Sequence, residues 1–152
     1  MRILTVRQPW AWAIIHGGKD VENRVRNVAG SYRGPVLIHA AQQWDDLVTD
    51  NDSWEAVLDA MKDDGSDPFD APWQTQRGVI IGVVDLTDAH LADTCEQWIE
   101  AHDRCSEWAD AEGWHLVLAN PRPLVEPIPY KGALGLRRLD DETIARIEGA
   151  IA

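Results

Sequence analysis

The sequence is short of the residues and patterns from which several classes of protein are built. It has two cysteines, Cys95 and Cys105, which are too few for a disulfide framework, so we expect a reduced, cytoplasmic setting. With no other cysteine, a cysteine-based zinc site has little to build on. The five histidines are scattered without metal-ligand spacing. We therefore expect no metal and no cofactor.

Long apolar runs are also missing. No stretch approaches the roughly 18 apolar residues of a membrane-spanning helix, and the N-terminus lacks the apolar core of a signal peptide. The sequence has no phosphate-binding loop, dinucleotide fingerprint, nucleophile elbow or zinc-protease motif. It also has no internal repeat, low-complexity segment or linker. Its 152 residues predict a single domain, 1–152, without a membrane partner.

Positive charge is scarce and unevenly distributed. The formal net charge is −12, which disfavours binding to a long polyanion. Residues 1–40, however, hold six Lys or Arg against two Asp or Glu, whereas residues 41–130 hold four against twenty. An acidic surface that favours solubility explains the middle block. A site that uses cations is therefore expected near the N-terminus.

The hydrophobic pattern predicts short strands that alternate with helical insertions. Helices are expected at 9–16 and at 141–151. Two more are expected to begin at Asp52 and at Asp93, where acidic residues resemble capping boxes. The segment 63–76 has the composition of a loop, and the prolines of 121–129 favour an extended, irregular chain. This pattern favours an α+β domain built on a small mixed β-barrel over a parallel βαβ fold. The expected strands are 2–6, 21–24, 35–40, 78–86, 114–119 and 135–139.

The best candidate site lies where the first helix ends. Gly17 and Gly18 end that helix, since glycine adopts the left-handed C-cap conformation without a steric penalty. Lys19 follows directly, and in an extended strand Glu22 and Arg24 project from the same face. These three charges predict either a functional site or a surface ion-pair cluster of little consequence.

Other candidate residues have plainer explanations. His39 lies in an apolar strand and is expected to be a hydrogen-bonded core histidine, and the two cysteines are expected to be packed thiols. Trp10 and Trp12 cannot easily both face inward, so we expect one of them to line a groove. An exposed aromatic ring beside cations is what stacking of a nucleobase requires.

Several motifs, taken together and in order, resemble the ASCH domain family. They are Gln8-Pro9-Trp10-Ala11, the run from Gly18 to Arg24, the segment from Tyr32 to Ala41, and the strand from Gly78 to Asp85. The segments 120–123 and 126–132 resemble the branch that contains the endothelial-overexpressed lipopolysaccharide-associated factor. Residues 42–77 and 88–112 have no clear counterpart.

The resemblance implies a PUA-like β-barrel with a cleft suited to RNA or a nucleobase. Some ASCH proteins are amidohydrolases that remove the acyl group from N4-acetylcytidine and related compounds, and their catalytic lysine corresponds to Lys19. They place a threonine nucleophile three residues later, where this chain has Glu22. Their further catalytic glutamate lies in the unaligned region, where Glu100 and Glu107 are candidates.

The sequence therefore predicts an amidohydrolase that acts on N4-acylated cytosine nucleosides or bases. Either Glu22 activates water while Lys19 stabilises the oxyanion, or Lys19 is the base. Two alternatives are a non-catalytic RNA-binding module and a ribonuclease that uses Lys19 with a histidine. The expected partner is a small nucleoside or nucleobase, with RNA as the alternative. The expected substrate-binding residues are Gln8, Trp10, Arg24 and Lys131.

Overall fold

The computed structural model describes residues 1–67, 70–95 and 105–151. Most of the expected strands and helices are present, with changes at their ends that are given below. The strands are β1 (Arg2–Val6), β2 (Val21–Arg24), β3 (Gly34–Ala40), β4 (Val79–Leu91), β5 (Trp114–Pro129) and β6 (Leu136–Arg138). The helices are α1 (Trp10–His16), α2 (Trp54–Asp64), α3 (Pro72–Thr75) and α4 (Asp141–Glu148), with short 3₁₀ turns η1 (Val48–Asp50) and η3 (Ala92–Thr94).

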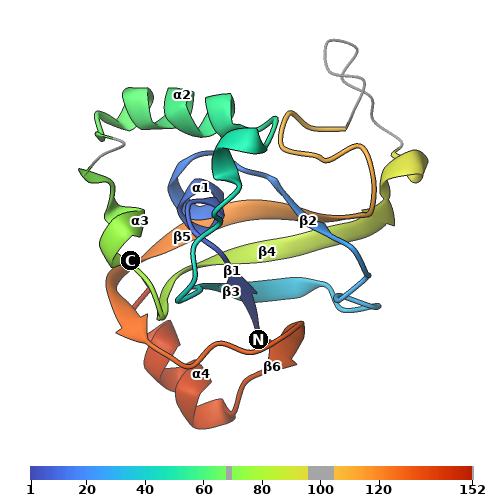
Figure 1. Ribbon diagram of the computed structural model, residues 1–152. Helices are drawn as coiled ribbons and strands as arrows, with labels where there is room; N and C mark the ends of the chain where they lie inside the picture. Colours follow the sequence, from blue (N-terminus) through green and yellow to red (C-terminus); the bar gives the residue numbers. More distant parts are fainter. Residues whose placement is uncertain (68–69, 96–104, 152) are drawn as a thin grey trace.

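All six strands belong to one curled sheet with the order β2-β5-β4-β3-β1-β6. Strands β1 and β3 are parallel, and the other neighbouring pairs are antiparallel. Figure 1 shows the sheet curving around α1, with α2 above that helix and α4 below the sheet. The sheet forms a half-barrel whose end strands, β2 and β6, are not neighbours, and the predicted mixed α+β architecture is confirmed.

The two faces of the sheet carry two separate apolar cores. On β1, Leu4 and Val6 face the larger core, which contains α1, whereas Ile3 faces the smaller one, which contains Ile147 of α4. This separation follows from the alternation of side chains along a strand. Helix α1 is therefore enclosed on the concave side, and its six residues from Trp10 to Ile15 are all buried.

Helix α1 approaches the sheet closely at Gly82 of β4. A Cβ atom at this position would lie 2.6 Å from Cδ1 of Ile15 and 2.8 Å from the backbone oxygen of Arg122. No side chain fits there without displacing the helix or β5. This glycine therefore sets the depth at which α1 packs, and with it the position of the chain that leaves the helix.

Strands β4 and β5 are longer than predicted, and the prolines of β5 do not end the strand. Pro123 and Pro129 pair with Gly82 and Val79 of β4 across a ladder whose register shifts at three places. Proline cannot donate to the ladder, so it is accommodated where pairing is already irregular. The prediction of an extended chain over 121–129 is therefore confirmed, but that of an irregular one is wrong, because the segment is part of β5.

The predicted helix starts are correct only in part. Helix α2 begins after Ser53, whose side chain makes no cap and instead donates to the backbone oxygen of Glu107 at 3.3 Å, so the predicted box at Asp52 is wrong. The predicted loop over 63–76 contains the short helix α3. The box at Asp93 coincides with η3, and the rest of its predicted helix, over 96–104, lies outside the described residues.

Two of the histidines that looked scattered are partners in the sheet. His90 of β4 pairs directly with His115 of β5, and the sulfur atoms of Cys95 and Cys105 lie against both rings. The expectation that the histidines lack the spacing of metal ligands is therefore wrong for these two. The cysteines are packed thiols as expected, since Cys95 is buried and Cys105 is partly buried. His39 behaves as expected, since it is buried and its ring nitrogens contact Thr5 Oγ1 and the backbone oxygen of Tyr130.

Among the described residues, no helix combines the length and the apolar character needed to cross a membrane.

Candidate active site

The site begins at the turn that joins α1 to β2. Gly17 ends the helix, and Gly18 takes the left-handed conformation with φ of 74°, which costs glycine little. The backbone N–H of Lys19 then donates to the backbone oxygen of Ala13 at 3.0 Å. This turn reverses the chain and points it into the edge strand β2, so Lys19 is held at the C-terminal end of α1.

Lys19 is buried rather than displayed at the surface, with a relative exposure of 4%. Its Nζ donates to the backbone oxygen of Val21 and lies between two indole rings, 5.7 Å from the centre of Trp10 and 5.8 Å from that of Trp108. Burial lowers the pKa of Lys19 below its ordinary value, while the nearby Glu22 carboxylate acts against that shift. A lysine in this environment gives up its proton more readily than one in water.

Glu22 lies between two cations. Its Oε2 is 3.7 Å from Nζ of Lys19, and its Oε1 is 3.1 Å from an amino nitrogen of Arg24. Glu22 and Arg24 thus share one face of β2, as the alternation along a strand predicts. Arg24 also donates to the backbone oxygen of Thr5 on β1 at 2.8 Å, which links the edge strand β2 to β1.

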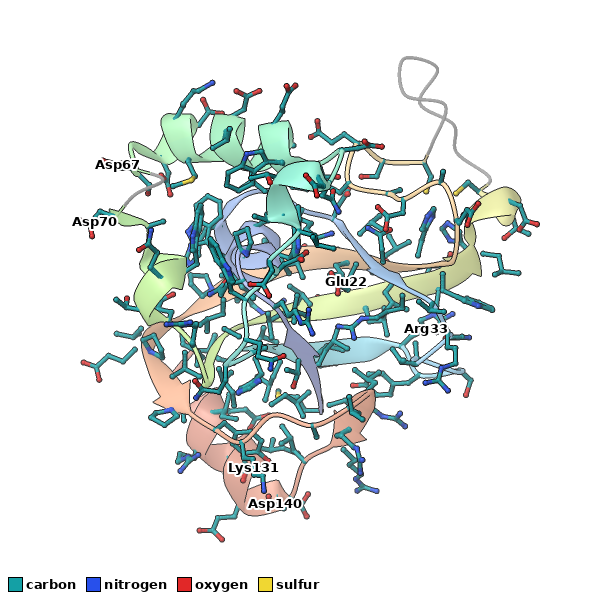
Figure 2. All side chains as sticks on the ribbon, in the orientation of Figure 1. Glu22, Arg33, Asp67, Asp70, Lys131 and Asp140 are labelled. Carbon is teal, nitrogen blue, oxygen red and sulfur yellow. The ribbon has the colours of Figure 1, made fainter. Side chains whose placement is uncertain are left out.

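A cleft of about 770 Å³ lies on the open side of the half-barrel, within the size range typical of small-molecule sites. Figure 2 shows Glu22 near the middle of the molecule, on β2. The cleft is lined by Thr5, Val6, Arg7, Trp10, Glu22, Asn23, Arg24, Val25, Ala41, Asp45, Gly132, Ala133, Leu134 and Gly135.

A smaller cavity of about 190 Å³ adjoins the cleft and contains Lys19. Trp10, Glu22, Asn23 and Asp45 line both spaces, so these four residues form the boundary that the cleft shares with the cavity of Lys19. A ligand in the cleft would therefore lie next to the cavity that holds Lys19. The remaining residues of the smaller cavity are Asn51, Ser53 and Asp110.

Of the two neighbouring tryptophans, Trp10 lines the cleft, as expected for one of the pair. Both rings are nevertheless buried and belong to the same apolar core, so the expectation that they cannot both face inward is wrong. Trp12 packs edge-on against Trp73, with ring centres 5.2 Å apart. Trp10 is 9% exposed, and its indole N–H donates to Oδ2 of Asp45 at 2.7 Å. This bond fixes the orientation of the ring at the wall of the cleft.

The charges that line the cleft are balanced. Its cations are Arg7 and Arg24, and its carboxylates are Glu22 and Asp45. A channel that holds a polynucleotide backbone is expected to carry an excess of cations. The balance here instead suits a ligand with little net charge and several polar atoms.

Three other expected site residues are not brought into the cleft. Gln8 is fully buried, and its amide donates to the backbone oxygen of Gln76 and accepts from the backbone N–H of Trp12. Lys131 is exposed and lies toward the end of the molecule that carries α4, away from Glu22 (Figure 2). Glu107 is exposed and lines neither cavity, and Glu100 lies outside the described residues.

Sequence reasoning missed several residues that the fold adds to the site. Asp45 belongs to the acidic block that looked like a solubilising surface, and Trp108 lies in a segment with no regular pattern. Asn23 joins this segment to β2, since its side-chain amide donates to the backbone oxygen of Trp108 at 2.9 Å and accepts from the backbone N–H of Asp110. No local signal identifies Asp45 or Trp108, because Asp45 joins the site through Trp10 and Trp108 through Lys19, both by contacts between distant parts of the chain.

Among the described residues, the histidines and the cluster of possible metal ligands lie outside the cleft and the cavity of Lys19. No histidine lines the cleft or the smaller cavity among residues 1–67, 70–95 and 105–151. Within the same residues, one group of side chains is arranged to hold a metal ion, namely His90, Cys95, Cys105 and His115. The site around Lys19 therefore offers acid–base and electrostatic groups.

A half-barrel sheet curled around one helix, with a cleft at its open side, defines a PUA-like domain. The chain belongs to the ASCH domain family, since the model of that domain matches residues 4–128. Roles in RNA binding or hydrolysis have been proposed for this family.

Solved structures of a Zymomonas mobilis ASCH protein are similar to this chain. Its crystal structure matches with a TM-score of 0.57 and 13% identity, covering 99% of this chain and 95% of that one. A tyrosine-to-phenylalanine variant of it matches with a TM-score of 0.56 and 14% identity, covering 99% and 98%. A serine-to-alanine variant matches at 0.55 and 14%, covering 99% and 96%. At this identity the likeness shows the fold.

Proposed function

We propose that this ASCH protein is an amidohydrolase that removes the acyl group from N4-acylated cytosine nucleosides or bases, such as N4-acetylcytidine. The observation that carries the proposal is the buried contact of 3.7 Å between Lys19 and Glu22 at the wall of the cleft. Such desolvated acid–base pairs are common at catalytic sites. We also propose that the chain belongs to the branch that segments 120–123 and 126–132 resemble.

The two side chains divide the work of amide hydrolysis between them. Glu22 lines the open cleft, so its carboxylate takes a proton from a water molecule while that water attacks the acyl carbon. The Lys19 ammonium stabilises the negative charge that develops on the acyl oxygen. When the carbon–nitrogen bond breaks, the protonated Glu22 returns its proton to the N4 nitrogen. The products are a carboxylic acid and the free cytosine amine.

The surroundings of Lys19 favour this role for an ammonium group. Two indole rings and the Val21 carbonyl oxygen stabilise a cation, and Arg24 shares the Glu22 carboxylate with it. In a site of low dielectric, a charge placed in advance stabilises an oxyanion more strongly than a charge in water does. The lowered pKa of Lys19 also leaves open that its neutral amine is the base.

The shape and charge of the cleft support a nucleoside as the ligand. A nucleoside carries no phosphate, which agrees with the equal numbers of cations and carboxylates at the wall. Trp10 supplies an aromatic surface held in place by Asp45, and Arg7 and Arg24 can donate to sugar or acyl oxygens.

Measuring the release of cytidine from N4-acetylcytidine by chromatography tests the proposal. Lys19→Ala and Glu22→Gln are each expected to reduce turnover by a factor of about 10²–10³, the usual effect of removing such a group. Lys62→Ala is the matched control, because Lys62 is an exposed lysine that pairs with Asp59 on α2. Circular dichroism confirms that each variant is folded.

Two results would contradict the proposal. The wild-type protein could fail to release cytidine from N4-acylated nucleosides, or Lys19→Ala could retain the turnover of Lys62→Ala while folded. If Glu22→Gln keeps its activity and Lys19→Ala loses it, the roles of the two residues are reversed. Lys19 is then the base.

A further inference from the structure

Four metal-ligating atoms converge at the far end of the long hairpin formed by β4 and β5. The Cys95 sulfur is 3.3 Å from Nε2 of His90 and 3.4 Å from Nδ1 of His115. The Cys105 sulfur is 3.6 Å and 3.2 Å from the same two nitrogens. All four ligand atoms lie within 4.8 Å of one another.

Each imidazole makes one hydrogen bond to a group outside the cluster, and this bond determines which ring nitrogen faces the two sulfur atoms. Nε2 of His115 is 2.7 Å from the backbone oxygen of Asp110, which can only accept, so this nitrogen carries the proton. Nδ1 of His90 is 2.8 Å from a carboxylate oxygen of Asp88, which fixes the same arrangement in the other ring. Each ring therefore directs a lone pair toward the two sulfur atoms.

Hydrogen bonds from the thiols do not account for this geometry. Two thiols have two protons to donate, whereas four sulfur–nitrogen contacts of 3.2–3.6 Å are present. A tetrahedral zinc ion has Zn–S bonds of about 2.3 Å and Zn–N bonds of about 2.0–2.1 Å, which place sulfur and nitrogen about 3.5 Å apart. The observed contacts match the edges of such a tetrahedron.

We infer that His90, Cys95, Cys105 and His115 bind one Zn²⁺ ion in a tetrahedral Cys₂His₂ site. Two thiolates and two imidazoles at tetrahedral spacing are typical of zinc. Binding releases both thiol protons, and the two thiolates then balance the charge of the ion. The bonds to Asp88 and to the Asp110 carbonyl are the outer contacts that orient ligating histidines in known zinc sites.

All four ligands come from protein side chains, so the site is structural and has no open position for a substrate. It joins the two ends of the connection between β4 and β5. The residue after Cys105 is Ser106, whose hydroxyl donates to Asp20 at 2.5 Å, and Trp108 then covers Lys19. The zinc ion thus holds the segment that forms the wall behind Lys19, whatever reaction the cleft performs.

The metal content of the purified full-length chain tests this inference. After dialysis against metal-free buffer, elemental mass spectrometry is expected to find one zinc ion per chain. The apo-protein, prepared with a chelator and a reductant and then titrated with Co²⁺, is expected to show the absorption bands of tetrahedral cobalt bound to thiolates. Removing the metal is expected to lower Tm and to increase proteolytic cleavage between residues 91 and 114.

Cys105→Ser and His115→Gln are expected to lose the zinc and the cobalt bands, whereas His16→Gln, which replaces an exposed histidine outside the cluster, keeps both. If the ligand variants fail to fold, the cobalt titration of the wild-type chain still decides the question. Three outcomes would overturn the inference. These are no bound zinc after incubation with Zn²⁺ and dialysis, no thiolate–cobalt band, or an intramolecular disulfide between the two cysteines under reducing purification.

Discussion

Nζ of Lys19 lies 3.7 Å from Oε2 of Glu22, and both side chains are at most 10% exposed. An ion pair at the surface contributes little to stability, but a buried pair costs desolvation that its surroundings must offset. Here Arg24, the Val21 carbonyl oxygen and two indole rings do so. The alternative of an inconsequential surface cluster is therefore wrong.

The first prediction concerns the pH dependence of stability. Burial lowers the pKa of Lys19 in the folded chain below its ordinary value of 10.5, so the unfolded chain binds this proton more tightly. Between the folded and unfolded pKa values, the free energy of unfolding contributed by this group rises with pH. We expect the wild-type protein to gain stability relative to Lys19→Met as the pH approaches 10.5. Urea denaturation across the alkaline range measures the difference.

Lys62→Met is the control for this experiment. The hydrogen bond and charge of Asp59 raise the pKa of Lys62, so its contribution to stability is lost, not gained, as the pH rises through that value. If the difference in the free energy of unfolding between wild type and Lys19→Met stays constant or falls as the pH rises, Lys19 is not desolvated.

The second prediction concerns the link between β2 and β1. Arg24→Met removes the bonds to the Glu22 carboxylate and to the Thr5 backbone oxygen, and leaves Glu22 with one cation. We expect a loss of about 1.5–3 kcal/mol in the free energy of unfolding, as for other hydrogen bonds to charged groups.

Arg122→Met is the matched comparison, because Arg122 pairs with Asp85 on the more exposed surface of β4 and β5. We expect Arg122→Met to lower the free energy of unfolding by about 0–1 kcal/mol. Urea denaturation of both variants at neutral pH measures the two values. An Arg24→Met variant no less stable than Arg122→Met would refute a bridging role for Arg24.

The third prediction concerns the depth at which α1 packs. Gly82→Ala would place a Cβ atom 2.6 Å from Ile15 and 2.8 Å from the Arg122 carbonyl oxygen. Overpacking of this kind costs about 1–3 kcal/mol, and the displaced helix is expected to move Lys19 and reduce turnover. Gly149→Ala is the control, since its nearest atoms are 3.7 Å away and its φ of −71° suits alanine. Equal Tm values for the two variants would contradict the close approach.

The fourth prediction concerns nucleic acid. Because the cleft carries as many carboxylates as cations and the net charge is −12, we expect weak binding to random single-stranded RNA at physiological salt. Fluorescence anisotropy with a labelled oligonucleotide measures the affinity at several salt concentrations. Tight binding with a steep salt dependence would instead favour the RNA-binding module, because that slope counts phosphate contacts.

By itself, the sequence determined the local structure around the site. Pro9, the two glycines and the period-two pattern of residues 21–24 predict a helix, a sharp turn and a strand that presents Glu22 and Arg24 together, and the structure has all three. These features depend on backbone preferences and side-chain alternation, which act between near neighbours.

Only the tertiary structure decided what surrounds that strand. Curling of the sheet brings Thr5 of β1 to Arg24, and the connection before β5 brings Trp108 over Lys19. The same pairing of β4 with β5 sets His90 beside His115, although the sequence separates them widely. Such contacts depend on strand order and register across the whole sheet, and no local pattern of residues encodes these.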